Sequence, residues 1–386
     1  MSNARVKPKV SRRGRVPPFI VMDVLRAANE RQAAGAEVIH LEVGQPGTGA
    51  PAGVLAAARA ALDGHRLGYT EALGIPSLRA RIARFYAERY GTSIEPGRIA
   101  VTTGSSAGFV AAFLAAFDEG DRVALAAPSY PAYRNILASL GLTPVILDAT
   151  VATRFQPSVE LIERAAPIAG LIVASPSNPT GAMLLPEALR TIADYCANTG
   201  IRLISDEIYH GITFGPPATT ALGANPDAIV INSFSKYFSM TGWRIGWMVV
   251  PEELVRPIEC LAQNLYISPP TLSQIAAEVA FECTAELDAI VARYARNRSL
   301  LLQELPAAGF DRLAPADGAF YLYADIGHLT NNSADFCARM LAEIGVAATP
   351  GIDFDAERGH RYLRFSFAGS EADIAKAVDK LKGWRR

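Results

Sequence analysis

Short apolar runs alternate with helix-like segments between residues 98 and 231, and this alternation constrains the fold more than any other feature. The runs predicted as strands are Ile99–Thr102, Arg122–Ala126, Pro144–Leu147, Leu171–Ala174, Arg202–Ser205 and Ala228–Ile231. The segments predicted as helices between them are Ser106–Phe117, Ala132–Leu140, Ser158–Ala165 and Glu187–Asn198. Strands that are apolar throughout are typical of a parallel sheet buried between helices. We therefore expect an α/β fold whose large domain holds a mostly parallel, seven-stranded sheet.

The character of the chain changes after Pro251, where several helices come before the next strands. Outside the alternating region, helices are predicted over Phe19–Ala34, Pro51–Leu62, Pro76–Arg89, Glu252–Gln263, Leu272–Cys283, Ala285–Leu305, Ala334–Ile344 and Glu371–Trp384, and strands over Val38–Leu41, Ala319–Tyr323 and Tyr362–Phe367. These segments predict a smaller α+β domain that the N-terminal helix completes. We expect an N-terminal arm and part of the small domain in 1–45, the large cofactor-binding domain in 46–285, and the small C-terminal domain in 286–386.

Charge and hydropathy narrow the classes of partner. The 386 residues carry a formal net charge of −1, which gives no support for a nucleic-acid partner. The longest apolar run, Ala107–Phe117, is too short to span a membrane. A basic N-terminal segment contains Arg5, Lys7, Lys9, Arg12, Arg13 and Arg15. No apolar core follows it before Pro17, so we interpret it as a mobile or loosely docked arm rather than a secretory signal.

The four cysteines are far apart and lack the spacing of a zinc site or a disulfide framework. They are Cys196, Cys260, Cys283 and Cys337. Free thiols of this kind are typical of a reducing compartment, so we expect a cytoplasmic protein with no metal site.

Polar residues follow the predicted strands. Because ligands of parallel α/β sheets bind beyond the carboxyl ends of the strands, these residues are predicted to share one rim. They are Gly104–Ser106, Pro128–Tyr130, Ser175–Asn178, Asp206–Tyr209 and Ser233–Lys236.

Lys236 follows the last of these strands, where burial would lower the pKa of its amine and make it a nucleophile or a base. Ser233, Ser235 and Arg244 offer two hydroxyls and a planar guanidinium to an anion. The segment Gly104-Ser105-Ser106 opens a helix, whose first N–H groups suit a phosphate. For the segment around Lys236, the alternative interpretation is a strand, a polar turn and a second strand in which the lysine is incidental. For the segment at Gly104, the alternative is an ordinary capped turn between a strand and a helix.

Asp206 also lies at the end of a buried strand, where a carboxylate needs a cationic partner such as a protonated ring nitrogen. A helix N-cap is the alternative role for this aspartate. Tyr209 and Asn178 can bond an oxygen on the same ring, and Tyr130 can lay its own ring on a flat ligand. A flat, phosphorylated ring with an electrophilic carbon for Lys236 meets all these demands. Pyridoxal 5'-phosphate is such a group.

Five motifs resemble those of the class I/II aminotransferases, which are pyridoxal-phosphate enzymes of the aspartate aminotransferase fold (fold type I). They are SPSNPTG at 175–181, DEIY at 206–209, SFSK at 233–236, GWRIGW at 242–247 and YLRFSFA at 362–368. The resemblance runs over nearly the whole chain, with the motifs in the family's order.

The resemblance implies an enzyme that moves an amino group from an L-amino acid to a 2-oxo acid by a ping-pong mechanism, through a Schiff base on Lys236. It implies that Arg364 grips the substrate carboxylate with help from the backbone of Gly44. It also implies that Tyr69 reaches the cofactor phosphate of a partner subunit, so that a homodimer shares its active sites. Asp206 and Tyr209 would be catalytic with Lys236.

Other functions of the same fold stay open at this point. A carbon–sulfur β-lyase is the first alternative, although such lyases tend to carry a histidine where this chain has Ser177. A non-catalytic pyridoxal-phosphate-binding regulator is less well supported, because no helix-turn-helix pattern precedes the fold. A nucleotide-binding protein is a further alternative, but the chain lacks both the Walker motif and GxGxxG.

The sequence says least about the substrate. Arg134 is a candidate cation for an acidic side chain, although a solvated helix charge is the simpler interpretation. Phe19, Ile20 and Phe320 can line an apolar pocket or belong to the core. The segment 44–47, GQPG, lacks the acidic residues that relatives often have at its second and fourth positions. We expect a neutral or broad amino donor, with 2-oxoglutarate or pyruvate as acceptor.

Overall fold

The computed structural model describes residues 8–385. Arg5 and Lys7 of the predicted N-terminal arm lie outside the described residues. Within the described part of that arm, Arg12–Gly14 form one turn of 3-10 helix, and Arg13 forms an ion pair with Glu119 at 2.9 Å.

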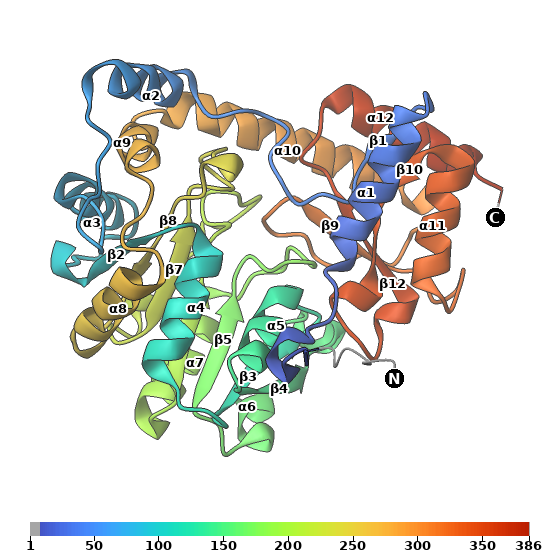
Figure 1. The fold of residues 1–386 in the computed structure, drawn as a ribbon. Coiled ribbons are helices and arrows are strands. Elements are labelled where there is room, and N and C mark those ends of the chain that lie inside the picture. The colour runs from blue at the N-terminus through green and yellow to red at the C-terminus, as the bar shows by residue number, and fades with distance from the viewer. Residues whose placement is uncertain (1–7, 386) are drawn as a thin grey trace, which may run out of the picture.

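The predicted helices and strands are present, with ends that differ by a few residues. The helices are α1 (Ile20–Ala33), α2 (Ala52–Gly64), α3 (Pro76–Tyr90), α4 (Ser105–Ala116), α5 (Pro131–Ser139), α6 (Val159–Ala165), α7 (Pro186–Thr199), α8 (Glu252–Leu265), α9 (Thr271–Ala280), α10 (Thr284–Glu304), α11 (Ser333–Ile344) and α12 (Glu371–Gly383). The strands are β1 (Ile39–His40), β2 (Ile99–Thr102), β3 (Arg122–Ala127), β4 (Thr143–Asp148), β5 (Gly170–Ala174), β6 (Arg202–Asp206), β7 (Ile229–Ser233), β8 (Gly246–Val249), β9 (Tyr321–Asp325), β10 (Val346–Ala347), β11 (Thr349–Pro350) and β12 (Tyr362–Ser366). Figure 1 shows how they are arranged.

A seven-stranded sheet in the order β2-β8-β7-β6-β5-β3-β4 forms the centre of the larger part (Figure 1). β8 is antiparallel to both of its neighbours, and the other strands run in one direction. The prediction of a mostly parallel sheet of seven strands is therefore confirmed. Because β2, β3, β5, β6 and β7 share a direction, their carboxyl ends meet at one edge of the sheet.

The strand–turn–strand interpretation of residues 228–249 is also correct, and it does not compete with a functional role for Lys236. β7 ends at Ser233, the chain turns, and β8 returns beside β7 with Ser233 opposite Gly246. Lys236 lies in that turn. The backbone of Arg244 adopts a left-handed conformation, with φ of 51°, just before β8 begins.

Helices cover both faces of this sheet, which explains why its strands are apolar throughout. Ile231 and Ile204 face a core formed with α4, α5 and α8, whereas Val230 and Leu203 face a core formed with α3, α7 and α9. These side chains are almost completely buried. Burial of each stabilises the fold by about 1.5–3 kcal/mol relative to exposure.

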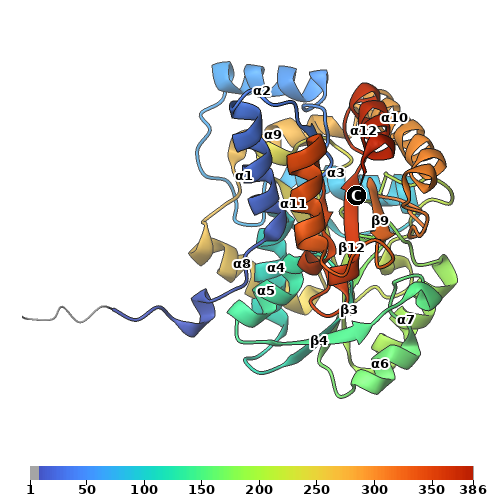
Figure 2. The ribbon, with the colours of Figure 1, turned by 90° about the vertical axis from the view of Figure 1, so that its right-hand side faces the viewer.

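The remaining segments form a smaller α+β part around an antiparallel sheet in the order β11-β12-β9, with β1 and β10 paired beside it. α1 packs on α11 through Ala28 and Leu341, so the N-terminal helix joins the C-terminal segments (Figure 2). The predicted smaller part is thus confirmed. The domain boundaries at residues 45 and 285 stay a prediction.

Two further features of the described residues bear on the predictions. None of their helices combines the length and the apolar character needed to cross a bilayer. All four cysteines are free thiols, with Cys196 and Cys337 fully buried.

Candidate active site

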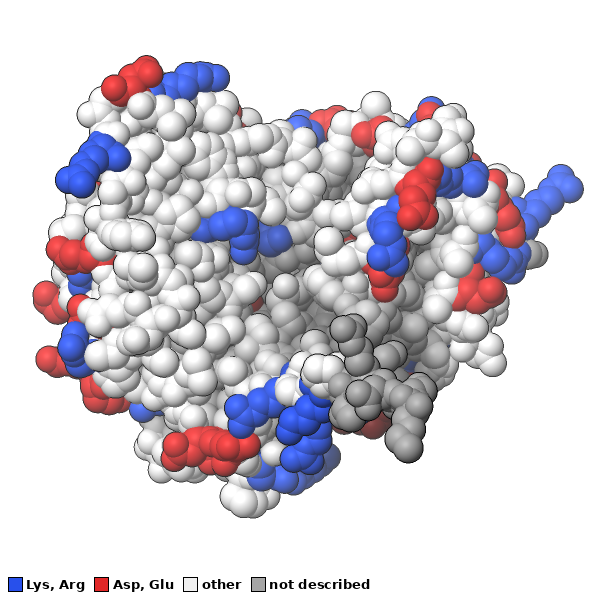
Figure 3. Space-filling view, viewed as in Figure 1, with Lys and Arg blue, Asp and Glu red and all other residues white. Residues whose placement is uncertain are grey.

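A cavity of about 520 Å³ lies between the carboxyl ends of the sheet strands and the smaller part. The face drawn in Figure 3 is hollowed between these two parts. The predicted site residues that line the cavity are Gly44, Ser105, Ser106, Tyr130, Asn178, Asp206, Tyr209, Ser235, Lys236, Arg244 and Arg364. The structure therefore brings together most of the residues that the motifs singled out, from segments more than 300 positions apart. Gly104, Ser233 and Tyr69 are outside the lining.

Lys236 lines this cavity, and a hydrogen bond fixes the position of its amine. Its Nζ donates a hydrogen bond of 2.5 Å to the carbonyl oxygen of Gly44. Burial, together with the positive charges of Arg364 and Arg244, lowers the pKa of Lys236 to about 8. About a tenth of the Lys236 side chains therefore carry an unprotonated, nucleophilic amine at pH 7, and about half do so at pH 8.

Asp206 is the last residue of β6 and is 4% exposed. Its Oδ2 accepts a hydrogen bond from the Tyr133 hydroxyl, and its Oδ1 accepts one of 3.1 Å from the Ile208 N–H. Burial raises the pKa of Asp206 to about 6, although these two bonds and Lys236 favour its ionised form. The carboxylate is suited to hold a cation that enters the cavity.

Tyr133 was not predicted as a site residue. It lies in the first turn of α5, three positions after the N-cap Tyr130, and the two ring centroids are 5.4 Å apart. That spacing is the signal that could have found it.

Tyr209 forms a hydrogen bond of 2.7 Å with the hydroxyl of Tyr321, a cavity residue that the sequence did not reveal. Burial raises the pKa of Tyr209 well above its usual value, so the hydroxyl stays protonated and can donate. The position of Tyr321 also explains why residue 44 is a glycine. A Cβ at this position would lie 2.1 Å from the Tyr321 oxygen, so any larger residue would displace that ring.

Arg364 is 2% exposed, and its guanidinium lies between the rings of Tyr321 and Phe354, at 4.3 and 4.7 Å. Its Nη1 donates to Asn178 Oδ1 at 2.7 Å, and its Nη2 donates to the Glu42 carbonyl at 2.5 Å. These partners are neutral oxygens. A buried guanidinium held this way is a ready partner for a carboxylate entering the cavity.

A second positively charged part of the cavity lies where α4 begins. Gly104, the N-cap of α4, has φ of 84°, and a Cβ on it would lie 2.4 Å from Arg244 Nη2. Ser105 and Ser106 are the first residues of the helix, so their N–H groups have no partner within it. Together with Ser235 they form a cradle for an anion.

Ser233 lies just behind this cradle. Its hydroxyl is 3.0 Å from the Ile245 carbonyl and accepts a hydrogen bond of 3.1 Å from the Ser235 N–H. The side chain thus holds the turn rather than facing the cavity.

Other predicted residues lie elsewhere. Tyr69 is 82% exposed and does not line the cavity of its own chain. Arg134 donates to the carbonyls of Asp353 (2.6 Å) and Phe354 (3.4 Å), so it is neither a cavity cation nor a freely solvated charge. It instead ties α5 to the smaller part.

Phe19 was one of three candidates for an apolar pocket, and it does line the cavity. Phe320 is packed in the core, and Ile20 is outside the lining. Val21 and Met22 of α1, which were not predicted, lie there instead. The Asp353 carboxylate accepts the Ile20 and Val21 N–H groups and so fixes the start of this helix.

Comparisons with known proteins agree with this geometry. Residues 36–381 match the model of the family described as aminotransferase class I and II. The chain is 52% identical to the valine–pyruvate aminotransferase of Mycobacterium tuberculosis, over 97% of this chain and 98% of that protein. The crystal structure of an aminotransferase from M. tuberculosis superposes with a TM-score of 0.96, at 52% identity, covering 98% of this chain and 99% of that one. Aspartate aminotransferase from Thermus thermophilus, with maleate, gives a TM-score of 0.93 at 31% identity, covering 98% and 100%.

The family match covers almost the entire chain, and the similarity to these relatives extends over both parts of the fold. The resemblance read from the five motifs is therefore confirmed. Enzymes of this family depend on pyridoxal phosphate. The protein belongs to the class I and II aminotransferases, and it is an aminotransferase of the aspartate aminotransferase fold.

Proposed function

We propose that this aminotransferase moves the amino group of a neutral, apolar L-amino acid to a 2-oxo acid such as pyruvate, with pyridoxal phosphate bound through Lys236. The observation that carries the proposal is the division of the cavity. Its cations lie where a phosphate, an aldehyde and one carboxylate would bind, and its outer wall is apolar.

The residues present fit the cofactor. Because Gly104 has no side chain, the Arg244 guanidinium can lie against it, where a Cβ would be 2.4 Å from Nη2, and the cradle is flanked by helix N–H groups and hydroxyls. We assign the cofactor phosphate to Gly104, Ser105, Ser106, Ser235 and Arg244, with Ser233 supporting the turn behind them. The amine of Lys236 provides the group that an aldehyde needs.

The opposite side of the cavity suits the cofactor ring. Asp206 would hold the proton on the ring nitrogen, because a carboxylate buried in this way is stabilised by a cation. Since the guanidinium of Arg364 can only donate, Asn178 presents its oxygen to Arg364, and its Nδ2 is left to donate to a ring oxygen. The Tyr209 hydroxyl would donate to the same oxygen. Tyr130 would lie against the ring.

When bound, pyridoxal phosphate supplies an aldehyde and a ring that takes up the electron pair released at the substrate's Cα. The chain supplies the proton transfer. Lys236 Nζ, with its lowered pKa, accepts the proton from Cα and returns it on the cofactor side, and the Gly44 carbonyl orients this nitrogen. A ping-pong sequence of two half-reactions follows, because the amino group leaves the donor before the acceptor enters.

We assign the class of substrate from the positively charged side chains that line the cavity. We assign the substrate carboxylate to Arg364, with Asn178 and the backbone of Gly44 beside it. Among residues 8–385 the other cations that line the cavity, Lys236 and Arg244, are then engaged by the cofactor. An acidic side chain would find no cation within this chain, whereas Phe19, Val21 and Met22 offer apolar contact. The name of the valine–pyruvate relative agrees with this choice.

We further propose a cytoplasmic homodimer with shared active sites. Tyr69 is 82% exposed, and Leu62, Leu265 and Ile267 are also exposed, at 61%, 52% and 48%. The face in Figure 3 carries few charged side chains over α4, α8 and α9. A surface that is poor in charge and exposes large apolar side chains is typical of an interface between copies of a chain. Four free thiols fit a reducing compartment.

The decisive test is a transamination assay on the cofactor-loaded enzyme with a panel of amino donors and pyruvate or 2-oxoglutarate. We expect valine and other neutral donors to exceed aspartate and glutamate by at least about tenfold in kcat/KM, the order expected when one buried charge lacks a partner. The variant K236A should have no measurable turnover. K376A, which alters an exposed lysine paired with Glu37, is the matched control and should be unaffected. Near-normal transamination by K236A, or release of ammonia in place of amino transfer, would refute the proposal.

A mixing experiment tests the shared sites. Chains with K236A and chains with Y69A should each be impaired alone. A hybrid dimer contains one site with an intact Lys236 from one chain and an intact Tyr69 from the other. Activity should therefore rise when the two variants are unfolded and refolded together, and no rise would contradict a contribution of Tyr69 across the interface.

A further inference from the structure

Glu207 and His210 are buried, titratable residues that the proposed reaction does not use. Their exposed fractions are 0% and 6%. They alternate along the chain with Asp206 and Tyr209, which line the active-site cavity, whereas neither Glu207 nor His210 does so. The pair therefore lies directly behind the segment that carries two of the proposed catalytic side chains.

The hydrogen bonds of His210 define which of its nitrogens carries the proton. Nε2 lies 3.0 Å from the carbonyl oxygen of Ser175, which can only accept, so this nitrogen is protonated. Nδ1 lies 2.8 Å from the Tyr90 hydroxyl, and in a neutral ring it accepts the tyrosine proton. Burial lowers the pKa of His210 to about 3, which keeps the ring neutral. His210 thus links the end of α3 to the segment after β5.

Glu207 supports this arrangement from the other side. Its Oε1 accepts hydrogen bonds of 2.9 Å from both the Ala221 N–H and the Thr220 hydroxyl. Its Oε2 has no hydrogen-bond partner and lies 3.5 Å from His210 Nδ1. An ionised oxygen here would face a nitrogen lone pair. Burial raises the pKa of Glu207 to about 8, so a proton on the carboxyl removes this repulsion.

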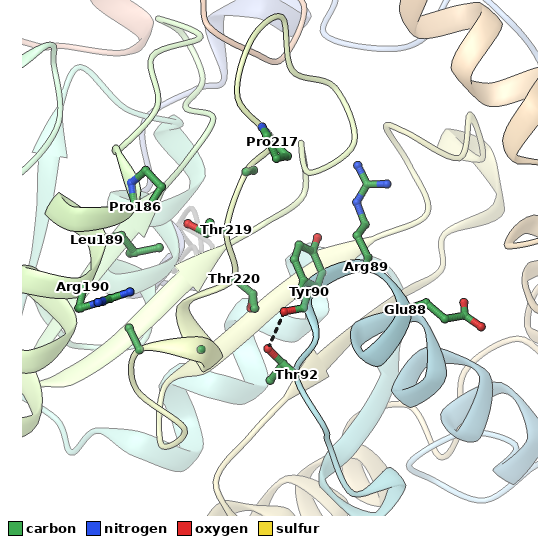
Figure 4. Close-up of a pocket in the computed structure, with 13 residues that line it drawn as sticks. Glu88, Arg89, Tyr90, Thr92, Pro186, Leu189, Arg190, Pro217, Thr219 and Thr220 are labelled. Atoms are coloured by element: carbon green, nitrogen blue, oxygen red, sulfur yellow. Dashed lines mark hydrogen bonds between the residues drawn. The ribbon is translucent and has the colours of Figure 1, made fainter.

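The network separates the active-site cavity from a second cavity of about 620 Å³. Tyr90, at the end of α3, and Thr220 both line this second cavity (Figure 4). Tyr90 forms a hydrogen bond with His210, and Thr220 forms one with Glu207. Tyr90 and Thr220 therefore form the end of this hydrogen-bond network that faces the second cavity and not the active site.

Ser175, the acceptor of the His210 bond, is the first residue of the turn that carries Asn178. The Oδ1 of Asn178 accepts from Arg364, and the turn itself is closed by a bond of 2.8 Å from the Gly181 N–H to the Ser177 carbonyl. A tilt of the turn at Ser175 would therefore reorient the Asn178 amide and, with it, the Arg364 guanidinium.

We propose that His210, backed by a neutral Glu207, is a positioning residue that holds the Ser175–Gly181 turn against the Asp206–Tyr209 segment and so orients Asn178 in the active site. This inference rests on the proposed function, because Asn178 is assigned there to the cofactor ring and the substrate carboxylate.

The test compares H210L, which removes the donor to Ser175, with H210Q, whose amide can place an N–H near the position of Nε2. In the cofactor-loaded enzyme H210L should lower kcat by about 3- to 10-fold, the range expected for one misplaced hydrogen bond. The visible absorption band of the bound cofactor should titrate about half a unit to one unit higher in pH, because Asn178 no longer draws charge from the ring oxygen. H210Q should recover both properties.

Y90F is the matched control, since it removes a hydrogen bond of the same ring but leaves the bond to Ser175. It should keep kcat within about twofold and leave the band unshifted, which separates the Ser175 bond from general loss of packing. E207Q, which retains a neutral group of the same shape, should also behave like wild type. If H210L lowers only the thermal midpoint, with kcat and the band unchanged, the positioning role is wrong. If the wild-type enzyme does not transaminate at all, the proposed function fails instead.

Discussion

Replacing Gly44 with alanine tests the geometry of the active site at its most crowded point. Gly44 is not in a left-handed conformation, so the substitution adds one methyl group without backbone strain. That methyl carbon would lie 2.1 Å from the Tyr321 oxygen and 3.1 Å from the ring carbon that bears it. Tyr321 is 1% exposed and the free space beside it is the active-site cavity, so a displaced ring would move into that cavity.

The expected cost can be worked from two contributions. Overpacking a well-filled site costs about 1–3 kcal/mol. If the ring moves, the bond between Tyr209 and Tyr321 is lost as well, at about 0.5–1.5 kcal/mol. The sum is about 1.5–4.5 kcal/mol, which for a chain of 386 residues is a fall in Tm of roughly 2–6 °C. Because the Gly44 carbonyl also orients Lys236, kcat/KM should fall by at least about tenfold.

The assay is thermal unfolding and transamination for G44A, Y321F and the double variant under the same conditions. Y321F removes the oxygen at 2.1 Å, so the alanine methyl should be accommodated better in its presence. The double variant should be at least about 1 kcal/mol more stable than the sum of the single effects predicts. G49A is the control, since a Cβ at Gly49 meets no atom within 4 Å. Equal effects of G44A and G49A, or strict additivity in the cycle, would show that the steric argument is wrong.

Three further predictions concern other residues of the active site. The pKa of Asp206 is raised from 3.8 to about 6, so its contribution to stability is fully present below pH 3.8 and is lost as the pH rises through about 6. The cofactor-free D206N variant should therefore be more stable than wild type at pH 8, by up to about 3 kcal/mol, but not at pH 3.5, and urea unfolding at both values checks this. G104A should weaken cofactor binding roughly 10-fold or more in a spectroscopic titration, whereas G97A, in open space, should not. R364K should lower kcat/KM for amino acids roughly 10- to 100-fold, because an ammonium cannot reproduce the planar two-point contact.

The sequence predicts the fold and the polar rim well because both depend on local patterns. Continuous apolar runs mark strands buried on both faces, and the residues after them reach the common edge once the strands run in one direction. Lys236, Asp206 and Asn178 could be identified in this way. Each is a polar group in a position where burial leaves it in need of a partner.

The other site residues could not be identified because their roles depend on packing between distant segments. Tyr321 looks like one more core aromatic in an apolar strand until its hydroxyl is seen 2.7 Å from that of Tyr209, 112 positions away. Phe354 likewise lies under the Arg364 guanidinium only because β12 and the segment after β11 are folded together. For Arg134 the pattern allowed a substrate contact or a solvated charge. The bonds that it makes are to backbone carbonyls, which no side-chain pattern marks.

The one antiparallel strand of the seven-stranded sheet, β8, explains how the residues of the anion cradle come together. β7 carries the chain out to the rim, the turn holds Lys236, and β8 brings it back between β7 and β2, with Gly246 opposite both Ser233 and Thr102. Arg244, two residues before Gly246, is therefore placed over the ends of two strands and beside Gly104. Only a glycine permits this return, because a Cβ at Gly246 would lie 2.8 Å from the Asn232 carbonyl oxygen and 3.1 Å from the Ser105 nitrogen. The close approach of β8 to the start of α4 is thus what places a guanidinium, a lysine amine and free helix N–H groups within one cavity.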